Sequence, residues 1–103
     1  MDIRSFQERV IKVFSEFDEL PNRTKHTKLS ATTHLMEEVG EVARQVTSEV
    51  HRPEKFEIDN LSSELADVMQ FIVVLADLYD IDLSKEMEKS IVKVEDKIVK
   101  LKQ

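Results

Sequence analysis

The chain has 103 residues, which is the size of one small domain, so we treat residues 1–103 as a single unit. It contains no Cys, which excludes disulfides and thiolate metal sites, and only one Gly and two Pro, which disfavours a turn-rich strand fold. Its net charge is −6. A nucleic-acid-binding domain usually carries a basic footprint, so we expect no nucleic-acid partner.

The first predicted helix begins near the N-terminus, where apolar residues recur at three- and four-residue steps. These residues are Ile3, Phe6, Val10, Val13, Phe14 and Phe17. Pro21 and Asn22 end it, and a basic polar loop with Arg23, Lys25 and His26 follows. The segment is amphipathic and carries acids, unlike a signal peptide, and no apolar run reaches membrane-spanning length, so we expect a cytoplasmic protein.

Two further helices are predicted from about Leu29 to Val50 and from about residue 60 to Tyr79. The apolar stripe of the first is Leu35, Val39, Val42 and Val46. Asp59 or Asn60 is expected to cap the second. From Val68 to Ala76 only Gln70 is polar. A helix that is apolar on nearly all sides needs burial on nearly all sides, and one short chain has too few helices to provide it. We therefore expect a homo-oligomer, either a dimer or a tetramer.

The last predicted helix begins after a short connector, Asp80-Ile81-Asp82, with Asp82 as its N-cap. Short connectors favour antiparallel neighbours, so the third and fourth helices are expected to pack together. The fourth helix has a coiled-coil-like apolar seam, formed by Met87, Ile91, Val94, Ile98 and Leu101. The predicted fold is therefore all-α, a four-helix bundle or a close variant.

Carboxylates occupy unusual places on the second and third predicted helices. Glu38 and Glu41 lie beside an apolar stripe, whereas Glu37 points further out, and Glu64 and Asp67 share a face that continues as apolar residues. Two carboxylates about 4 Å apart repel by roughly 4 kcal/mol at an effective dielectric near 20. Protonation, a cationic side chain or a metal would relieve this, and no Lys or Arg is spaced to reach between Glu64 and Asp67.

We therefore expect a metal ion held by oxygen ligands, which favours Mg²⁺, with Mn²⁺ as a possible substitute. The simpler alternative is that these acids form the solvated flank of exposed helices. That alternative suits Glu37 better than it suits Glu64 and Asp67.

The acids also match a known pattern. Glu37-Glu38-Val39-Gly40-Glu41, followed after 22 residues by Glu64-Leu65-Ala66-Asp67, resembles the EExxE…ExxD signature of MazG-like nucleotide pyrophosphohydrolases. The similarity extends over about residues 26–98. It implies an all-α oligomer that cleaves a nucleoside triphosphate between the α and β phosphates with Mg²⁺. The implied metal ligands are Glu38, Glu41, Glu64 and Asp67.

The resemblance also implies other roles. Glu37 would act behind the ligands or as the base on the attacking water, so the catalytic candidates are Glu37 and Glu38. The candidates for substrate binding are His26, Lys28, His34, Phe71, Lys93 and Lys97. Lys93 and Lys97 would hold pyrophosphate, although Asp96 stands where relatives commonly have Asn. Each of these has a plainer alternative: a polar loop, a surface His, a core Phe or a solvated Lys face.

Two rival functions remain open at this stage. One is a non-enzymatic helical module whose acids bind a structural or regulatory cation. The other is a related phosphatase that releases diphosphate from a substrate other than a nucleotide.

Overall fold

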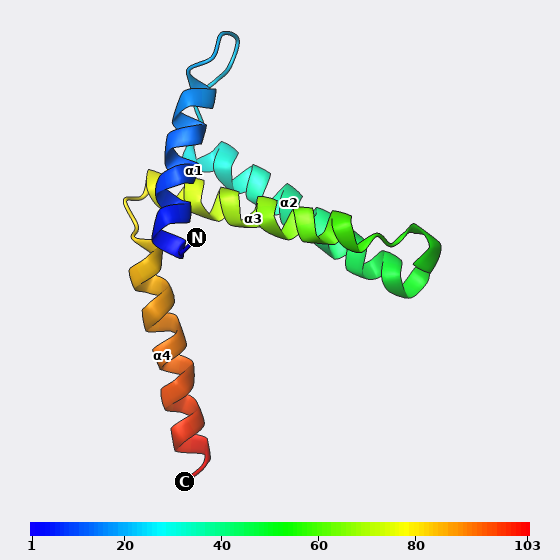
Figure 1. Ribbon diagram of the computed structural model, residues 1–103, viewed down its shortest axis with the longest axis vertical. Coiled ribbons are helices and arrows are strands. Elements are labelled where there is room, and N and C mark those ends of the chain that lie inside the picture. Colours follow the sequence, from blue (N-terminus) through cyan, green and yellow to red (C-terminus); the bar gives the residue numbers. More distant parts are fainter.

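The computed structural model describes all 103 residues and is entirely helical (Figure 1). The helices are α1 (Ile3–Asp18), α2 (Lys28–His51), α3 (Ile58–Leu78) and α4 (Leu83–Leu101), with a short 3₁₀ turn, η1 (Pro53–Lys55), between α2 and α3. The four predicted helices are thus confirmed. None of them is both long and apolar enough to cross a lipid bilayer.

Side chains cap three of the helices. Asp2 accepts a hydrogen bond from the backbone N–H of Ser5 at the start of α1, which holds the pKa of the Asp2 carboxyl below its ordinary value. Thr27 and Ser30 form a reciprocal capping box on α2. Asp82 accepts from the N–H of Lys85, as predicted. The predicted cap of α3 is wrong: α3 begins earlier, and Glu57 stands at the N-cap without a side-chain bond.

Helices α2 and α3 form a long antiparallel hairpin, and α1 packs across α3 at the open end of this hairpin (Figure 1). The core lies at this crossing and contains Val10, Ala31, Val73 and Val74, with Phe14 and other partly buried residues against it. Ala31 is fully enclosed, so only a small side chain lets α2 approach α1 and α3 here. The position of the core leaves most of the hairpin outside it.

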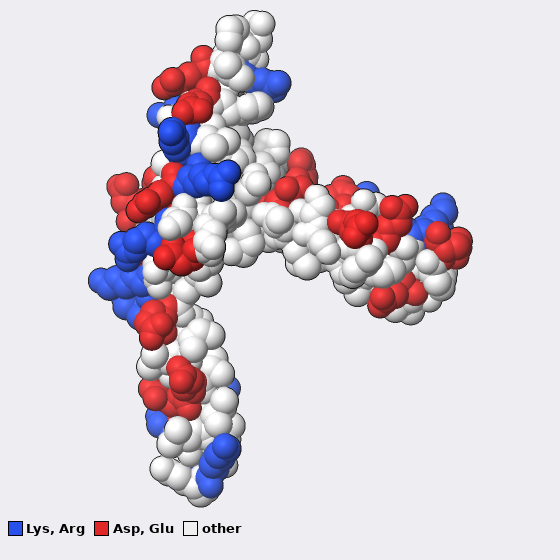
Figure 2. All heavy atoms as spheres, viewed as in Figure 1, with Lys and Arg blue, Asp and Glu red and all other residues white.

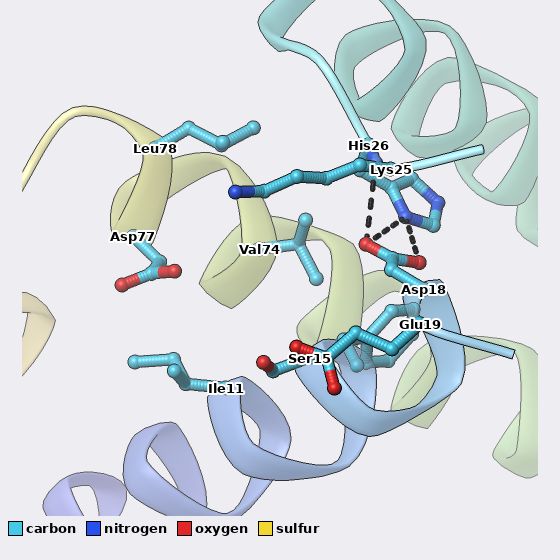
Figure 3. A pocket seen from close by; sticks show the side chains of 10 residues that line it. Ile11, Ser15, Asp18, Glu19, Lys25, His26, Val74, Asp77 and Leu78 are labelled. Atoms are coloured by element: carbon cyan, nitrogen blue, oxygen red, sulfur yellow. Dashed lines mark hydrogen bonds and ion pairs between the residues drawn. The ribbon is translucent and has the colours of Figure 1, made fainter.

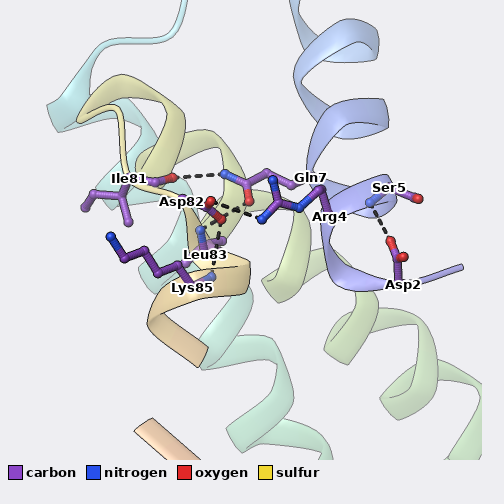
Figure 4. A network of polar contacts seen from close by, with 8 residues as sticks. All are labelled: Asp2, Arg4, Ser5, Gln7, Ile81, Asp82, Leu83 and Lys85. Atoms are coloured by element: carbon purple, nitrogen blue, oxygen red, sulfur yellow. Dashed lines mark hydrogen bonds and ion pairs between the residues drawn. The ribbon is translucent and has the colours of Figure 1, made fainter. Parts of the chain in front are cut away.

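Helix α4 does not pack against α3, which corrects the antiparallel prediction. The connector is instead fastened to α1 (Figure 4): Gln7 donates to the carbonyl of Ile81 and accepts from the N–H of Leu83, and Arg4 pairs with Asp82 at 3.3 Å. Helix α4 therefore leaves the junction away from the hairpin, and one chain does not close a four-helix bundle (Figure 1).

The predicted stripe of α2 is also partly wrong. Val39 and Val46 are each 50% exposed, whereas Glu38, Glu41, Val42 and Gln45 are half-buried. The side of α2 that carries Glu38, Glu41 and Gln45 thus faces inward, and the side that carries Val39 and Val46 faces outward. In α3, Val73, Val74 and Ala76 are buried, and the rest of the segment from Val68 is half-buried within a single chain. Whether a second copy covers the remainder stays a prediction.

Candidate metal and nucleotide site

The hairpin brings together four of the five predicted acids. Because α2 and α3 are antiparallel and joined through η1, residues in the middle of α2 lie opposite residues in the middle of α3. Glu38 and Glu41 of α2 are half-buried, as are Glu64 and Asp67 of α3. The fifth acid, Glu37, is outside this group, with a 64% exposed side chain that lies 3.5 Å from Nδ1 of His34. The sequence analysis predicted that Glu37 points further out than the other four acids, and their burial agrees with this prediction.

The electrostatics of Glu38 show that these acids act on one another. The pKa of the Glu38 carboxyl is raised above its ordinary value, first because burial removes water from it. The negative charges of Asp67, Glu41, Glu64 and Glu37 raise it further, in that order. Asp67 on the facing helix has a larger effect than either acid on the helix of Glu38 itself. The acids of α2 and α3 therefore share one local field.

Few positive groups compensate this field. Arg44 lies 3.3 Å from Glu41, in an exposed pair one helical turn apart. Glu38, Glu64 and Asp67 have no Lys, Arg or His within ion-pair distance. One oxygen of Glu64, Oε2, is buried and has no hydrogen-bond partner. A buried carboxylate oxygen without a donor is costly, and a bound cation would satisfy this atom.

These residues fit a hard divalent cation in their chemistry. All the donors are carboxylate oxygens, which suit Mg²⁺ and Mn²⁺, and their charge is largely unpaired. Their arrangement is open: no three His, Asp or Glu side chains in the chain stand together as a ready-made ligand set. Side chains on fixed helices would therefore have to rotate to close around an ion. The prediction of four ligands remains a prediction, with the acids placed in one region.

An aromatic cluster occupies the next layer of the hairpin, toward its open end. His34 lies one turn before Glu38, and Phe71 one turn after Asp67. Their rings stack, with centroids 5.2 Å apart and planes inclined by 19°. His26 contacts both rings edge-on or tilted, and Phe14 of α1 contacts His26 and Phe71. Three of the predicted substrate residues, His26, His34 and Phe71, thus lie together beside the acids.

Asp18 fixes the position of His26, and the sequence analysis missed it. Its carboxylate accepts from the backbone N–H of His26 at 3.2 Å and lies 3.0 Å from the ring Nδ1. The two side chains are only 12% and 14% exposed. Because a carboxylate faces Nδ1, the proton belongs on that nitrogen, and Nε2 is the free ring atom. An acid eight residues before a loop His gives no periodic signal, so spacing did not indicate this contact.

A cavity of about 230 Å³ adjoins the aromatic cluster (Figure 3). It lies between the end of α1, the following loop and the end of α3, with Phe14, Asp18, Lys25 and His26 among its lining residues. Lys25 extends along its rim over Val74 (Figure 3). None of the four clustered acids lines it. The cavity is therefore separate from the group of clustered acids.

The remaining predicted substrate residues lie elsewhere. The ammonium of Lys28 sits 4.3 Å from the centroid of the Tyr79 ring, a cation–π contact at the start of α2. Lys93 and Lys97 are exposed on α4, which leads away from the hairpin (Figure 1). Within one chain, the structure therefore does not bring Lys93 and Lys97 to the acids.

Comparison with protein families gives one match. The MazG nucleotide pyrophosphohydrolase domain matches residues 26–100, which includes both acid motifs, the aromatic residues of the hairpin and most of α4. No curated protein and no solved structure matches the chain. The matched region covers well over half of the sequence. The chain belongs to the MazG nucleotide pyrophosphohydrolase family.

Proposed function

We propose that this protein hydrolyses nucleoside triphosphates between the α and β phosphates, releasing the monophosphate and pyrophosphate, and that it does so as a Mg²⁺-dependent homo-oligomer. The observation that carries the proposal is the group of acids on α2 and α3, in which Glu38 has a raised pKa and Glu64 an unpartnered buried oxygen. Membership of the MazG family supports the class of reaction.

The ligands in this proposal are Glu38, Glu41, Glu64 and Asp67. A bound divalent cation would offset triphosphate charge and lower the pKa of an attacking water. Arg44 forms an exposed ion pair with Glu41, and a bound cation can replace this pair at little cost in free energy. The uncompensated acids of α2 and α3 would thus be neutralised by the ion that the substrate also needs.

The protein side chains have separate tasks. Glu37 is exposed outside the group of clustered acids, 3.5 Å from Nδ1 of His34, and in this proposal it accepts a proton from the attacking water. The stacked pair of His34 and Phe71 offers a flat aromatic surface next to the acids, suited to a nucleobase or ribose. His26, held by Asp18, completes the nucleoside side of the site, and Lys28 would reach it only by leaving the Tyr79 ring.

A panel of ribo- and deoxyribonucleoside triphosphates with Mg²⁺ tests the reaction. We expect release of pyrophosphate, detected as orthophosphate only after an inorganic pyrophosphatase is added, and loss of activity with a chelator. Mn²⁺ should restore the chelated enzyme. Direct release of orthophosphate would contradict cleavage between the α and β phosphates. Cation binding without turnover of any nucleotide would favour a structural or regulatory cation site instead.

A further inference from the structure

The imidazole ring of His26 is held on one side by a largely buried carboxylate. Both oxygens of Asp18, the last residue of α1, lie near Nδ1 of the ring, at 3.0 and 3.1 Å, and one of them also accepts a hydrogen bond from the backbone N–H of His26 (Figure 3). The side chains of Asp18 and His26 are 12% and 14% exposed. The ring also meets Phe14 edge-on. These contacts fix the ring in one orientation.

The second ring nitrogen of His26, Nε2, has no partner in the chain. The polar contacts of His26 are made by its backbone N–H and by Nδ1. The one enclosed side-chain oxygen or nitrogen without a partner is Oε2 of Glu64, so Nε2 of His26 is open to solvent. In Figure 3 it points away from the rim of the cavity along which Lys25 extends. A ring that is fixed through one nitrogen and presents the other is suited to contact a ligand.

His26 lies in the layer of the hairpin where the proposed function places the nucleoside. On the face drawn in Figure 2, the charged side chains of the hairpin are mainly acidic, so the triphosphate depends on a cation bound there. In the aromatic layer next to the acids, the centroid of the His26 ring is 5.5 Å from that of His34 and 6.0 Å from that of Phe71. The His34 side chain is 47% exposed. A nucleoside that packs against this exposed ring therefore lies within reach of His26.

Asp18 determines which role Nε2 of His26 can take. An ionised carboxylate accepts hydrogen bonds and donates none, so the Nδ1 atom that faces it carries the ring proton. In a neutral imidazole the other nitrogen then has a lone pair and no proton. Nε2 can therefore accept a hydrogen bond from a ligand but cannot donate one.

We propose that Asp18 determines substrate specificity through His26: it keeps Nε2 as an acceptor, which selects a nucleoside that presents an N–H or O–H donor at this point, from its base or from its sugar. Asp18 is thus a positioning residue, and His26 is the group that touches the nucleoside. This role rests on the proposed function, since it concerns the same substrate. Asp18 and Phe14 precede residues 26–100, so the specificity comes in part from outside the region that matches the family.

The substitution Asp18→Asn separates this role from a purely structural one. The carboxamide of Asn has nearly the shape of the carboxylate, and its oxygen can still accept from the backbone N–H of His26. Its NH₂ group would donate to Nδ1, which moves the ring proton to Nε2 and turns the acceptor into a donor. If Asp18 only ties the end of α1 to the following loop, Asn should serve as well as Asp.

We expect Asp18→Asn to raise KM for the preferred nucleoside triphosphate at least about tenfold and to leave kcat within about twofold, because the lost contact is present before and during the reaction. In a His26→Ala background, the same substitution should have no further effect on KM, because Asp18 acts through His26. Glu19→Gln is the matched control. Glu19 is the exposed acid next to Asp18 and forms no ion pair, so its replacement should leave both constants within about twofold.

Two sets of substrates locate the donor. Cytosine and adenine carry an amino donor where uracil and hypoxanthine carry a keto acceptor. If the donor is on the base, the ratio of kcat/KM for dCTP to that for dUTP, or for dATP to that for dITP, should change at least about tenfold between wild type and Asp18→Asn. If the donor is a sugar hydroxyl, these ratios should stay constant, and removal of that hydroxyl should raise KM about tenfold in wild type but not in Asp18→Asn.

Nuclear magnetic resonance provides a readout that needs no nucleotide. The ¹⁵N shifts of the His26 ring in mildly alkaline buffer should show the proton on Nδ1 in wild type and on Nε2 in Asp18→Asn. A wild-type proton on Nε2, or kinetic constants of Asp18→Asn that match those of Glu19→Gln, would overturn the role of Asp18 while leaving the proposed hydrolysis intact. A wild type that hydrolyses no nucleotide would instead refute the proposed function, and the role of Asp18 with it.

Discussion

Replacing Glu38 with Gln, or Asp67 with Asn, should lower kcat/KM for nucleoside triphosphates by at least about a hundredfold, because loss of a partner behind a metal ligand already costs about 10- to 100-fold. Loss of the ligand itself removes both charge and an oxygen from the site. Glu38 and Asp67 come from different helices, and Asp67 is the acid that acts most strongly on Glu38. The two substitutions should therefore have similar effects. The measurement is steady-state pyrophosphate release at saturating Mg²⁺.

Glu49→Gln is the matched control for this experiment. Glu49 is an exposed carboxylate on α2, beyond the acid group, and it forms no ion pair. Its replacement removes the same charge from the same helix and should leave kcat/KM within about twofold of wild type. If Glu38→Gln and Asp67→Asn behaved like Glu49→Gln, the proposed ligand set would be wrong.

The same Glu38→Gln substitution should stabilise the protein when divalent cations are removed. Burial and four neighbouring acids raise the pKa of Glu38 above its ordinary value of 4.5. A carboxyl with a raised pKa in the folded state binds its proton more tightly there than in the unfolded chain. Its contribution to stability is therefore present below the unfolded pKa and is lost as the pH rises through the folded pKa. At pH 7 the ionised Glu38 is a cost to folding.

We expect Glu38→Gln to gain of order 1 kcal/mol at pH 7 with chelator, or about 4–8 °C in melting temperature for a domain of this size. The gain should shrink as the pH falls toward 4.5, where Glu38 of the wild type also becomes neutral. Thermal unfolding at fixed protein concentration measures it. Saturating Mg²⁺ should reverse the order, because it stabilises the wild type by binding the folded state. A variant that is less stable than wild type in chelator would contradict this account.

Much of the fold was predictable from local signals. Apolar periodicity located all four helices, and Asp82 was identified as a cap because its side chain needs only a neighbouring backbone N–H. The direction of α4 was not predictable in this way. It depends on contacts of Gln7 and Arg4 with residues more than seventy positions along the chain. The short connector favoured an antiparallel pair, but these tertiary contacts override that preference.

The candidate site was likewise predictable only where helical periodicity determines it. The helical faces predicted that Glu38, Glu41, Glu64 and Asp67 turn inward, and the structure confirms their burial. The same reasoning placed Val39 in the core, but the acids and Gln45 take the side of α2 that faces α3, which leaves Val39 exposed. The contact between Asp18 and His26 joins a helix end to a loop, so no period could indicate it.

Calorimetric titration of the metal-free protein with Mn²⁺ tests the central claim most directly, namely that acids of α2 and α3 hold one divalent-cation site together. We predict saturable binding to wild type and to Glu49→Gln, and affinity lowered by at least about tenfold in Glu38→Gln on one helix and in Asp67→Asn on the other. Binding that survives unchanged in both of these variants, or that is absent from the wild type with and without nucleotide, would contradict the account.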